Sequence, residues 1–377
     1  RRLGLDVNAG SGVDILSVTV PTFRSDIVIE EDLIEEVGRI YGYENIPETL
    51  PVGGTTQGGD SPDGRFLSDV RQILASAGLS EVVAHSLTAP FAFDTAEDVA
   101  RRISVRNSLS PEISTLRRSL LPGLLEVARH NAARGQHALS LFEVGRVWQN
   151  EGTTEAVEPA EYVAIGGLIS GNPAETGWQH DTTPVSADFY LIRGIVERLA
   201  SGLGLGGLTF EPLGDQGASL PQFHPGRTAL LRIHGEIVGV VGEVHPAITA
   251  KFDLREKPYA FEVSMNALQA AIPAEGKPFQ TLSKHQAAGR DLAPRLAEAV
   301  AYSEVEAAVH SANVPHLEAF RLTDVYRGAP LPENTKSLTL SFVFRSPDKT
   351  LLETEVAEAM AQIRAALEMQ CGATFAL

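Results

Sequence analysis

The sequence predicts an α+β fold, in which antiparallel sheets and helices come from separate stretches of the chain. Between about residues 65 and 265, apolar strands meet mostly through hairpins and the helices stand apart from them, as in antiparallel sheet domains. The end of the chain reads strand, helix, strand, strand, helix, strand, which is the ferredoxin-like order. Gly- and Pro-rich stretches separate these regions and predict three domains, at residues 1–51, 52–276 and 277–377.

The first region is expected to contain one short strand and one helix. The strand covers residues 15–20, and the helix begins after Asp26 and ends at Gly42. Apolar residues recur along this helix at steps of three and four, which predicts a single buried stripe. The stripe consists of Leu33, Ile34, Val37, Ile40 and Tyr41.

The second region is expected to hold the largest sheet. Helices are predicted where amphipathic stretches stop at a glycine, and strands where short apolar runs are bounded by polar residues. His234 and Gly235 form a two-residue hairpin connection between two such strands. The predicted helices cover residues 65–77, 120–134 and 188–203; the predicted strands cover residues 82–87, 138–148, 163–170, 228–233 and 237–244, with a polar hairpin tip at 149–161.

The third region supplies the ferredoxin-like pattern. Phe342 and Phe344 share one face of their strand, and we interpret them as core residues beneath the helices, with contact to RNA bases as the alternative. The elements expected in order are a strand near Asp291, a helix at 303–311, strands at 319–326 and 337–344, a helix at 353–369 and a strand at 374–377.

The composition excludes several classes of protein. Apolar residues make up 43% of the 377 residues, which is enough to bury sizeable cores. No stretch reaches the roughly 18 apolar residues of a membrane span, so we expect no membrane partner. The 31 Lys and Arg against 48 Asp and Glu give a net charge of −17. This charge argues against non-specific coating of nucleic acid but is compatible with a local basic face.

Cysteine usage and the start of the chain indicate its setting. The single cysteine, Cys371, excludes a disulfide within the chain and a zinc site built from cysteines. We therefore expect a reducing, cytoplasmic location. The chain begins Arg-Arg-Leu-Gly without an initiator methionine or a signal-peptide apolar segment, which predicts the carboxy-terminal piece of a longer protein.

Acidic residues gather around the first helix. Asp32, Glu35 and Glu36 follow the i, i+3, i+4 spacing that places carboxylates on one helix face, and Asp26 lies just before the helix. Carboxylate oxygens without Cys or His suit Mg²⁺. The alternative is a solvated acidic helix start that the helix dipole favours.

The third region contains candidate RNA contacts on or beside its two central strands. Aromatic rings can stack on exposed bases while Arg and Lys contact phosphate. Alternate strand positions face opposite ways, so only some of these side chains can reach RNA. The candidates are Tyr326, Arg327, Lys336, Arg345 and Lys349.

Several motifs, taken in order, resemble the beta subunit of phenylalanine–tRNA ligase. No single motif is specific, but together they cover essentially the whole chain. They are VTVPTFRSDI at 18–27, EDLIEEVGRIYGYENIP at 31–47, NSLSPEISTLRRSLLPGLL at 107–125, LFEVGRVW at 141–148, HPGRTA at 224–229, LTDVYRG at 322–328 and KSLTLSFVFRSPDKT at 336–350. The chain departs from the family pattern in two ways. First, the family's longer amino-terminal part, with its oligonucleotide-binding and editing modules, is absent. The approach to the third region is also more polar, at residues 285–299, so its first strand is expected to differ from the family pattern.

The resemblance implies a partial helical domain, a class II synthetase-like antiparallel sheet core without catalytic residues, and a ferredoxin-like anticodon-binding domain. It implies that Asp26, Asp32, Glu35 and Glu36 bind Mg²⁺ shared with a catalytic alpha subunit. It also implies that the alpha subunit is the main site for ATP and phenylalanine. Arg117, Arg118 and Glu143 lie where a working class II site binds ATP, and we favour a structural role for them.

The function implied is that of a non-catalytic beta subunit. It would support ATP-dependent attachment of phenylalanine to tRNA, in protein biosynthesis, through heterotetramer assembly, magnesium binding and anticodon recognition. The chain alone is expected to be inactive. The alternative is a non-enzymatic RNA-binding or scaffolding protein that retains the synthetase-like fold, and co-purification of an alpha partner separates the two. An independent ATP-dependent ligase would require ATP-binding arginines that the sequence does not show.

Overall fold

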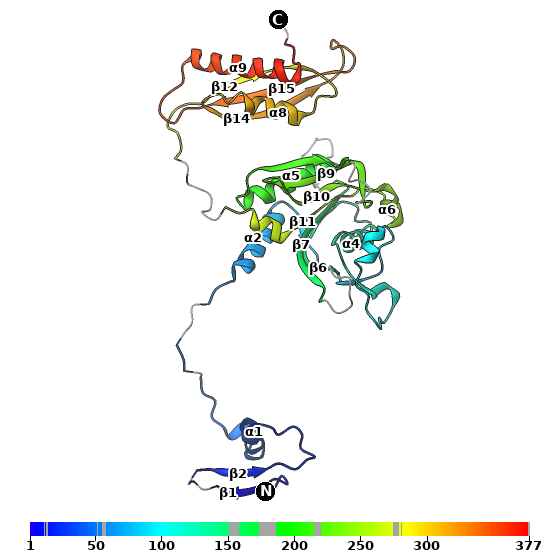
Figure 1. Cartoon of the computed structure of the whole chain (residues 1–377), viewed down its shortest axis with the longest axis vertical. Coiled ribbons are helices and arrows are strands. Elements are labelled where there is room, and N and C mark those ends of the chain that lie inside the picture. Colours follow the sequence, from blue (N-terminus) through cyan, green and yellow to red (C-terminus); the bar gives the residue numbers. More distant parts are fainter. Residues whose placement is uncertain are drawn as a thin grey trace. The chain divides into compact units, whose positions relative to one another are not determined.

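The computed structural model of the chain describes residues 1–10, 12, 14–50, 52–54, 58–150, 158–172, 186–214, 220–273, 279 and 281–375 (Figure 1). The chain divides into two compact units, Arg1–Ser68 and Asp69–Leu377. The described part has mixed helices and sheets, which confirms the α+β prediction. No described helix is both long and apolar enough to cross a membrane.

The first unit contains a hairpin and a helix. Strands β1 (Asp6–Ala9) and β2 (Leu16–Thr19) pair antiparallel, and α1 (Glu30–Tyr41) is followed by a short 3₁₀ turn, η1 (Tyr43–Asn45). The strand β1 was not expected from the sequence. Helix α1 ends at Gly42, whose φ of 92° lies in the region that favours glycine.

The prediction of a buried stripe on α1 is wrong for most of its members. Ile34, Val37 and Tyr41 are 62%, 69% and 62% exposed, and Ile40 is 55% exposed. Within the described part of this unit, a two-stranded hairpin is too small to cover a helix face of this size. The helical period therefore gave the correct element, but the surface that would cover its apolar face is not provided by this unit.

Helix α2 (Pro62–Ser76) crosses the boundary between the two units. It starts where the Ser61 hydroxyl accepts a hydrogen bond from the Gly64 backbone N–H at 3.0 Å, a side-chain cap of the kind that serine favours. It is followed by Gly78 with φ of 91°. Val70 and Leu74 on the second part of the helix are fully buried.

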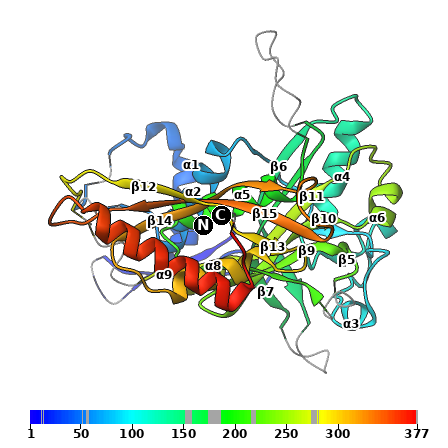
Figure 2. The same ribbon diagram turned by 90° about the horizontal axis from the view of Figure 1, so that it is seen from above.

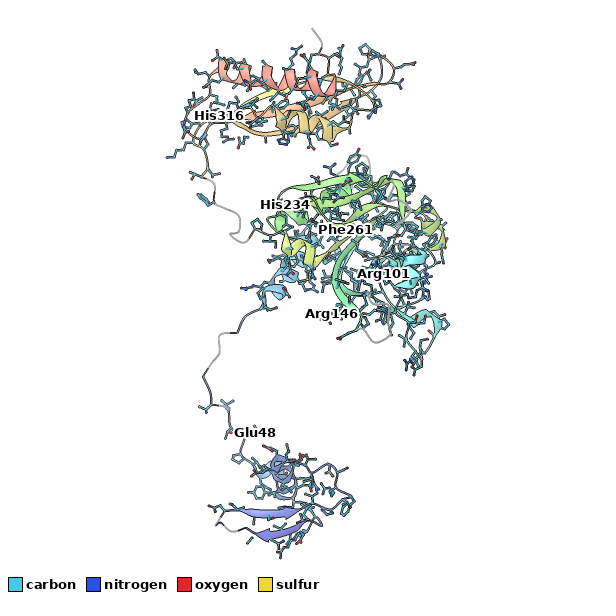
Figure 3. All side chains as sticks on the ribbon, viewed as in Figure 1. Glu48, Arg101, Arg146, His234, Phe261 and His316 are labelled. Carbon is cyan, nitrogen blue, oxygen red and sulfur yellow. The ribbon has the colours of Figure 1, made fainter. Side chains whose placement is uncertain are left out.

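The second unit contains a seven-stranded sheet. Its strands lie in the order β3-β6-β7-β11-β10-β9-β8, and all neighbours are antiparallel except β3 and β6. The turn between β9 and β10 is at His234 and Gly235, as predicted (Figure 3). The strands are β3 (Ser80–Glu81), β6 (Leu139–Gln149), β7 (Ala160–Ser170), β8 (Leu208–Pro212), β9 (Phe223–Ile233), β10 (Glu236–Val244) and β11 (Tyr259–Ser264).

Helices and a small accessory region accompany this sheet. Helix α4 (Leu121–Ala132) packs on β6 and β7. A Cβ atom at Gly166 would lie 3.2 Å from Leu120 and 3.3 Å from Leu124, so a larger residue there would require these side chains to move. Residues 151–157 of the expected hairpin tip lie outside the described residues. The other elements are β4 (Leu87–Thr88), α3 (Ala96–Ala100), η2 (Pro111–Ile113), β5 (Thr115–Leu116), α4 (Leu121–Ala132), α5 (Phe189–Gly202), α6 (Pro246–Lys251) and α7 (Met265–Ala270).

A four-stranded sheet ends the chain. One edge of β15 (Thr335–Phe344) pairs with β12 (Ala288–Leu292) and β13 (Arg295–Ala297), and its other edge pairs with β14 (Leu317–Tyr326). Residue Thr374 bridges Arg295. With β12 and β13 counted as one interrupted strand, this gives the ferredoxin-like order, which confirms the prediction.

The first strand of this sheet differs from a continuous strand, as the polar sequence at 285–299 suggested. The interruption falls at Pro294. A proline has no N–H to donate to the neighbouring strand, so it breaks the pairing there. Of the expected last strand, only the bridge at Thr374 is described, and residues 376–377 lie outside the described residues.

Two helices cover one face of the four-stranded sheet. Helices α8 (Tyr302–Ser311) and α9 (Glu353–Cys371) lie next to each other (Figure 2) and share one apolar core with the sheet. Phe342 and Phe344 are 0% and 1% exposed in this core. The interpretation of both residues as core is confirmed, and contact with RNA is excluded for them.

Candidate functional site

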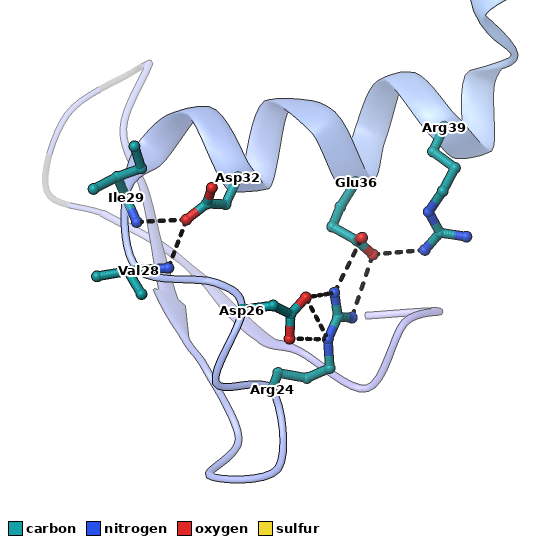
Figure 4. A network of polar contacts seen from close by, with 7 residues as sticks. All are labelled: Arg24, Asp26, Val28, Ile29, Asp32, Glu36 and Arg39. Carbon is teal, nitrogen blue, oxygen red and sulfur yellow. Dashed lines mark hydrogen bonds and ion pairs between the residues drawn. The ribbon is translucent and has the colours of Figure 1, made fainter. Parts of the chain in front are cut away.

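The acidic residues of the first unit surround an arginine (Figure 4). Arg24 donates to Asp26 at 2.7 and 3.0 Å and forms an ion pair with Glu36 at 3.0 Å. Arg39 donates to the other oxygen of Glu36 at 2.7 Å. These guanidinium groups lower the pKa of Glu36, Arg24 more than Arg39, and Arg24 likewise lowers the pKa of Asp26. The negative charge of Asp26 and Glu36 is thus already compensated within the chain.

Asp32 has a different task, at the start of α1. Its carboxylate accepts the backbone N–H groups of Val28 at 2.7 Å and of Ile29 at 2.9 Å, so it satisfies donors that a helix start leaves unpaired. These two bonds, with Ile29 first, lower its pKa. Glu35 is exposed.

The four carboxylates as arranged do not fit a magnesium ion. Mg²⁺ needs oxygen ligands at about 2.1 Å in octahedral geometry, whereas Asp32 is engaged with backbone N–H groups and a guanidinium separates Asp26 from Glu36. No group of three or more His, Cys, Asp or Glu in the described part of the chain could hold a metal. This geometry gives the magnesium assignment no support, and the assignment stays a prediction from the resemblance.

The core arginines form ion pairs. Arg117 donates to Glu143 at 2.6 Å, and the two side chains are 5% and 2% exposed. Arg117 also donates to the backbone carbonyl of Arg146 at 2.9 Å, and a Cβ at Gly145 would lie 2.2 Å from its guanidinium. Arg118 pairs with Asp98. These contacts support the structural interpretation of Arg117, Arg118 and Glu143.

Lys336 requires a correction among the candidate RNA contacts. Its side chain points to the helix-covered face of β15, together with Phe342 and Phe344, and the residue is only 9% exposed. Its ammonium donates to the backbone carbonyls of Glu298 at 2.9 Å and Val300 at 2.6 Å. Lys336 therefore anchors the end of the first strand and is not accessible to RNA.

The other candidates lie at the surface and each has a partner within the same domain. Arg327 pairs with Glu298 at 2.8 Å and Arg345 with Glu318 at 2.8 Å. Lys349 pairs with Glu355, and the Tyr326 hydroxyl donates to the carbonyl of Ala329. Binding a phosphate would require these cations to leave a carboxylate.

The sheet face opposite the helices has a different composition. Ser337, Thr339 and Ser341 of β15 alternate with its buried residues and form a row of half-buried hydroxyl groups. Arg295 and Tyr326 lie opposite Ser337, and Arg321 lies opposite Ser341, so they share this face. The structure describes no ion pair for Arg295 or Arg321, both exposed.

Sequence reasoning missed Arg295 and Arg321. The signal that could have found them is the alternation along β15: once Phe342 is assigned to the core, Ser341 and its cross-strand neighbour Arg321 must face the other way. To identify Arg295 and Arg321 as residues of this face, one also needs the register in which the strands pair, and the sequence did not supply it.

Comparison with known proteins gives matches over most of the chain. The family model described as "Phenylalanyl tRNA synthetase beta chain CLM domain" matches residues 46–265, "Ferredoxin-fold anticodon binding domain" matches residues 283–375, and "tRNA synthetase B5 domain" matches residues 1–43. The phenylalanine–tRNA ligase beta subunit of Geobacillus kaustophilus is 37% identical over 95% of this chain and 43% of its own length. The same subunit of Bacillus subtilis is 36% identical over 98% of this chain and 44% of its own length.

The chain thus spans less than half the length of these curated relatives. Among solved structures, a pyrrolysyl-tRNA synthetase from Desulfitobacterium hafniense aligns with a TM-score of 0.43 at 11% identity, over 63% of this chain and 74% of its own. At this TM-score the alignment does not establish a shared fold.

Proposed function

Since the chain belongs to the phenylalanyl-tRNA synthetase beta chain family, we propose that it is the non-catalytic part of a ligase that attaches phenylalanine to tRNA. The observation that carries the proposal is the succession of three matched regions, at residues 1–43, 46–265 and 283–375, in one chain. We propose the domains at 1–51, 52–276 and 277–377, as expected from the sequence.

The absence of catalysis by this chain alone is the first part of the proposal. A class II reaction needs arginines that can bind the triphosphate of ATP, and Arg117 and Arg118 are each engaged with a carboxylate. The test is phenylalanine-dependent exchange of pyrophosphate into ATP by the purified chain. We expect no exchange above a protein-free blank, and exchange by the chain alone would overturn this part of the proposal.

The partner is an alpha subunit that binds ATP and phenylalanine. Exposed apolar side chains on α1 of the first unit, among them Ile34 and Val37, are compatible with a chain that works within a larger assembly. Affinity purification of the chain from its native cells, followed by mass measurement of the intact complex, tests this. Recovery without any synthetase-like partner would favour the non-enzymatic RNA-binding or scaffolding alternative.

Binding of tRNA is assigned to the helix-free face of the four-stranded sheet. Exposed Arg295 and Arg321 can meet phosphate while the ring of Tyr326 stacks on a base. As candidate RNA contacts, Arg295 and Arg321 take the place of the buried Lys336. We also prefer them to Arg327, Arg345 and Lys349, because in the described structure they need not leave an ion pair to bind phosphate.

A charge reversal at Arg321 tests the RNA face. Arg321→Glu should weaken binding of an anticodon stem-loop and reduce the dependence of affinity on salt, because fewer counterions are released. The matched control is Arg364→Glu, which makes the same charge change on the exposed side of α9, where Arg364 pairs with Glu368. Equal losses for both variants would show that the helix-free face is not the binding surface.

A further inference from the structure

A cavity lies beside the start of α4 in the second unit. Its volume is about 240 Å³. One part of its lining is aromatic, with Phe91, Phe93, Phe223 and Phe261. Phe223 and Phe261 are 3% and 1% exposed and belong to the sheet core. The position of Phe261 within the seven-stranded sheet is shown in Figure 3.

Not every carboxylate in the lining forms an ion pair with an arginine. The cavity is lined by three carboxylates, and two of them have a cation: Asp94 pairs with Arg102, and Asp98 pairs with Arg118. Glu262 has neutral donors instead. One of its oxygens accepts the Ser119 hydroxyl at 2.8 Å and the Leu120 backbone N–H at 2.7 Å.

Arg117, the remaining arginine of the lining, does not compensate Glu262 by direct contact. Its guanidinium pairs with Glu143 at 2.6 Å. The cavity therefore combines apolar rings, which favour an apolar ligand body, with one carboxylate that lacks an ion-pair partner among the described residues. A ligand group that balanced this carboxylate would be a cation.

We propose that this cavity binds a small primary amine with an aromatic or branched aliphatic body, with its ammonium group on Glu262. The apolar body would lie among the phenylalanine rings, and the ammonium would donate to the carboxylate oxygen that Ser119 and Leu120 do not use. A cation near aromatic rings gains further attraction from their faces.

The burial of Glu262 disfavours its charged form while no cation is bound. Loss of water raises the pKa of its carboxyl group, although the hydroxyl of Ser119, the N–H groups of Leu120 and Leu121 and the charge of Arg117 act in the opposite direction. An ammonium ligand would favour the ionised carboxylate. The rival is an anionic ligand on Arg118, whose Nε is buried without a hydrogen-bond partner in the described structure, but whose charge is already paired with Asp98.

Three probes of similar shape distinguish these ligands. Phenethylamine carries the cation, 2-phenylethanol is its neutral counterpart, and 3-phenylpropionate carries an anion. Isothermal titration calorimetry on the full 377-residue chain should show phenethylamine binding about tenfold more tightly than the alcohol, as expected for a hydrogen bond to a charged group. Tightest binding by the anion, equal binding of amine and alcohol, or no binding by any probe would each overturn the proposal.

Substitutions locate the binding. Glu262→Gln retains an oxygen that can accept from Ser119 and Leu120 but removes the charge, so it should abolish the preference for the amine. Glu126→Gln makes the same charge change on the exposed side of α4, outside the cavity lining, and should leave the preference intact.

A second variant covers the case in which Glu262→Gln does not fold. Ala89→Phe adds a ring to the cavity wall and leaves Glu262 and its two donors unchanged, so phenethylamine binding should be lost from a chain whose circular dichroism is unaltered. Unchanged binding in Ala89→Phe would place the amine elsewhere and overturn the proposal. This inference does not depend on the proposed role in tRNA charging.

Discussion

Replacing Glu143 by alanine should destabilise the seven-stranded sheet strongly, because it leaves a buried charge without its counterion. The carboxylate accepts from Arg117 at 2.6 Å, and the two side chains are 2% and 5% exposed. After the substitution, the hydrogen-bond partners left to Arg117 among the described residues are the carbonyl of Arg146 at 2.9 Å and, more weakly, that of Ala84 at 3.4 Å. Breaking a buried pair from one side costs about 3–5 kcal/mol.

The assay is urea unfolding followed at Trp148, a residue of β6 whose backbone N–H donates to the carbonyl of Arg117 at 3.0 Å. All variants would carry Trp178→Phe, so that the fluorescence reports on Trp148, since the chain has two tryptophans. The matched control is Glu126→Ala, because Glu126 forms an exposed pair with Arg129, worth about 0–1 kcal/mol.

A double variant separates charge from volume. Glu143→Leu with Arg117→Met removes both charges, and replacing both members of a buried pair with apolar residues is often close to neutral. The double variant should therefore be more stable than Glu143→Ala. A loss below about 1 kcal/mol for Glu143→Ala, or a double variant no more stable than the single one, would refute the account of a buried, mutually dependent pair.

Three further predictions concern the first unit and the tail sheet. The pKa of Asp32 is lowered by the N–H groups of Ile29 and Val28, so its contribution to α1 is complete above about pH 4 and is lost as pH falls further. Protection of the Val28 and Ile29 N–H groups from hydrogen exchange, taken relative to the intrinsic exchange rate at each pH, should fall in that range, and Asp32→Asn should remove this pH dependence. Phe342→Ala should cost the tail sheet about 3–5 kcal/mol by denaturant unfolding, since Phe342 is fully buried. Because Arg24 holds Asp26 and Glu36, millimolar Mg²⁺ should not raise the unfolding temperature of the chain, and a rise that Glu36→Gln abolishes would contradict the lack of fit.

Local signals predicted the elements whose ends are fixed by nearby residues. The glycine at 78 and the His234–Gly235 pair have positive φ, and the sequence marked all three positions as ends or turns because such backbone favours particular residues. The long helix at the end of the chain was predicted at 353–369 and observed as Glu353–Cys371.

The sequence predicted the candidate functional residues less well than it predicted the helices and turns. The sequence identified Asp26, Asp32 and Glu36 as a set, but their hydrogen bonds assign Asp32 to the helix start and the other two to Arg24. It selected Lys336 for its charge, although the pleat turns that side chain under the helices. Charge and spacing do not specify which partner a flexible side chain takes.

The sequence alone determined the family, the α+β class and the order of the three regions, because these depend on residue types and hydrophobic period along the chain. The tertiary structure alone decided that Arg295 and Arg321 share the helix-free face, and that Glu262 faces a cavity in which it forms no ion pair with any described residue. These facts depend on strand register and on which distant segments meet, since Ser119 and Glu262 are 143 positions apart in the chain.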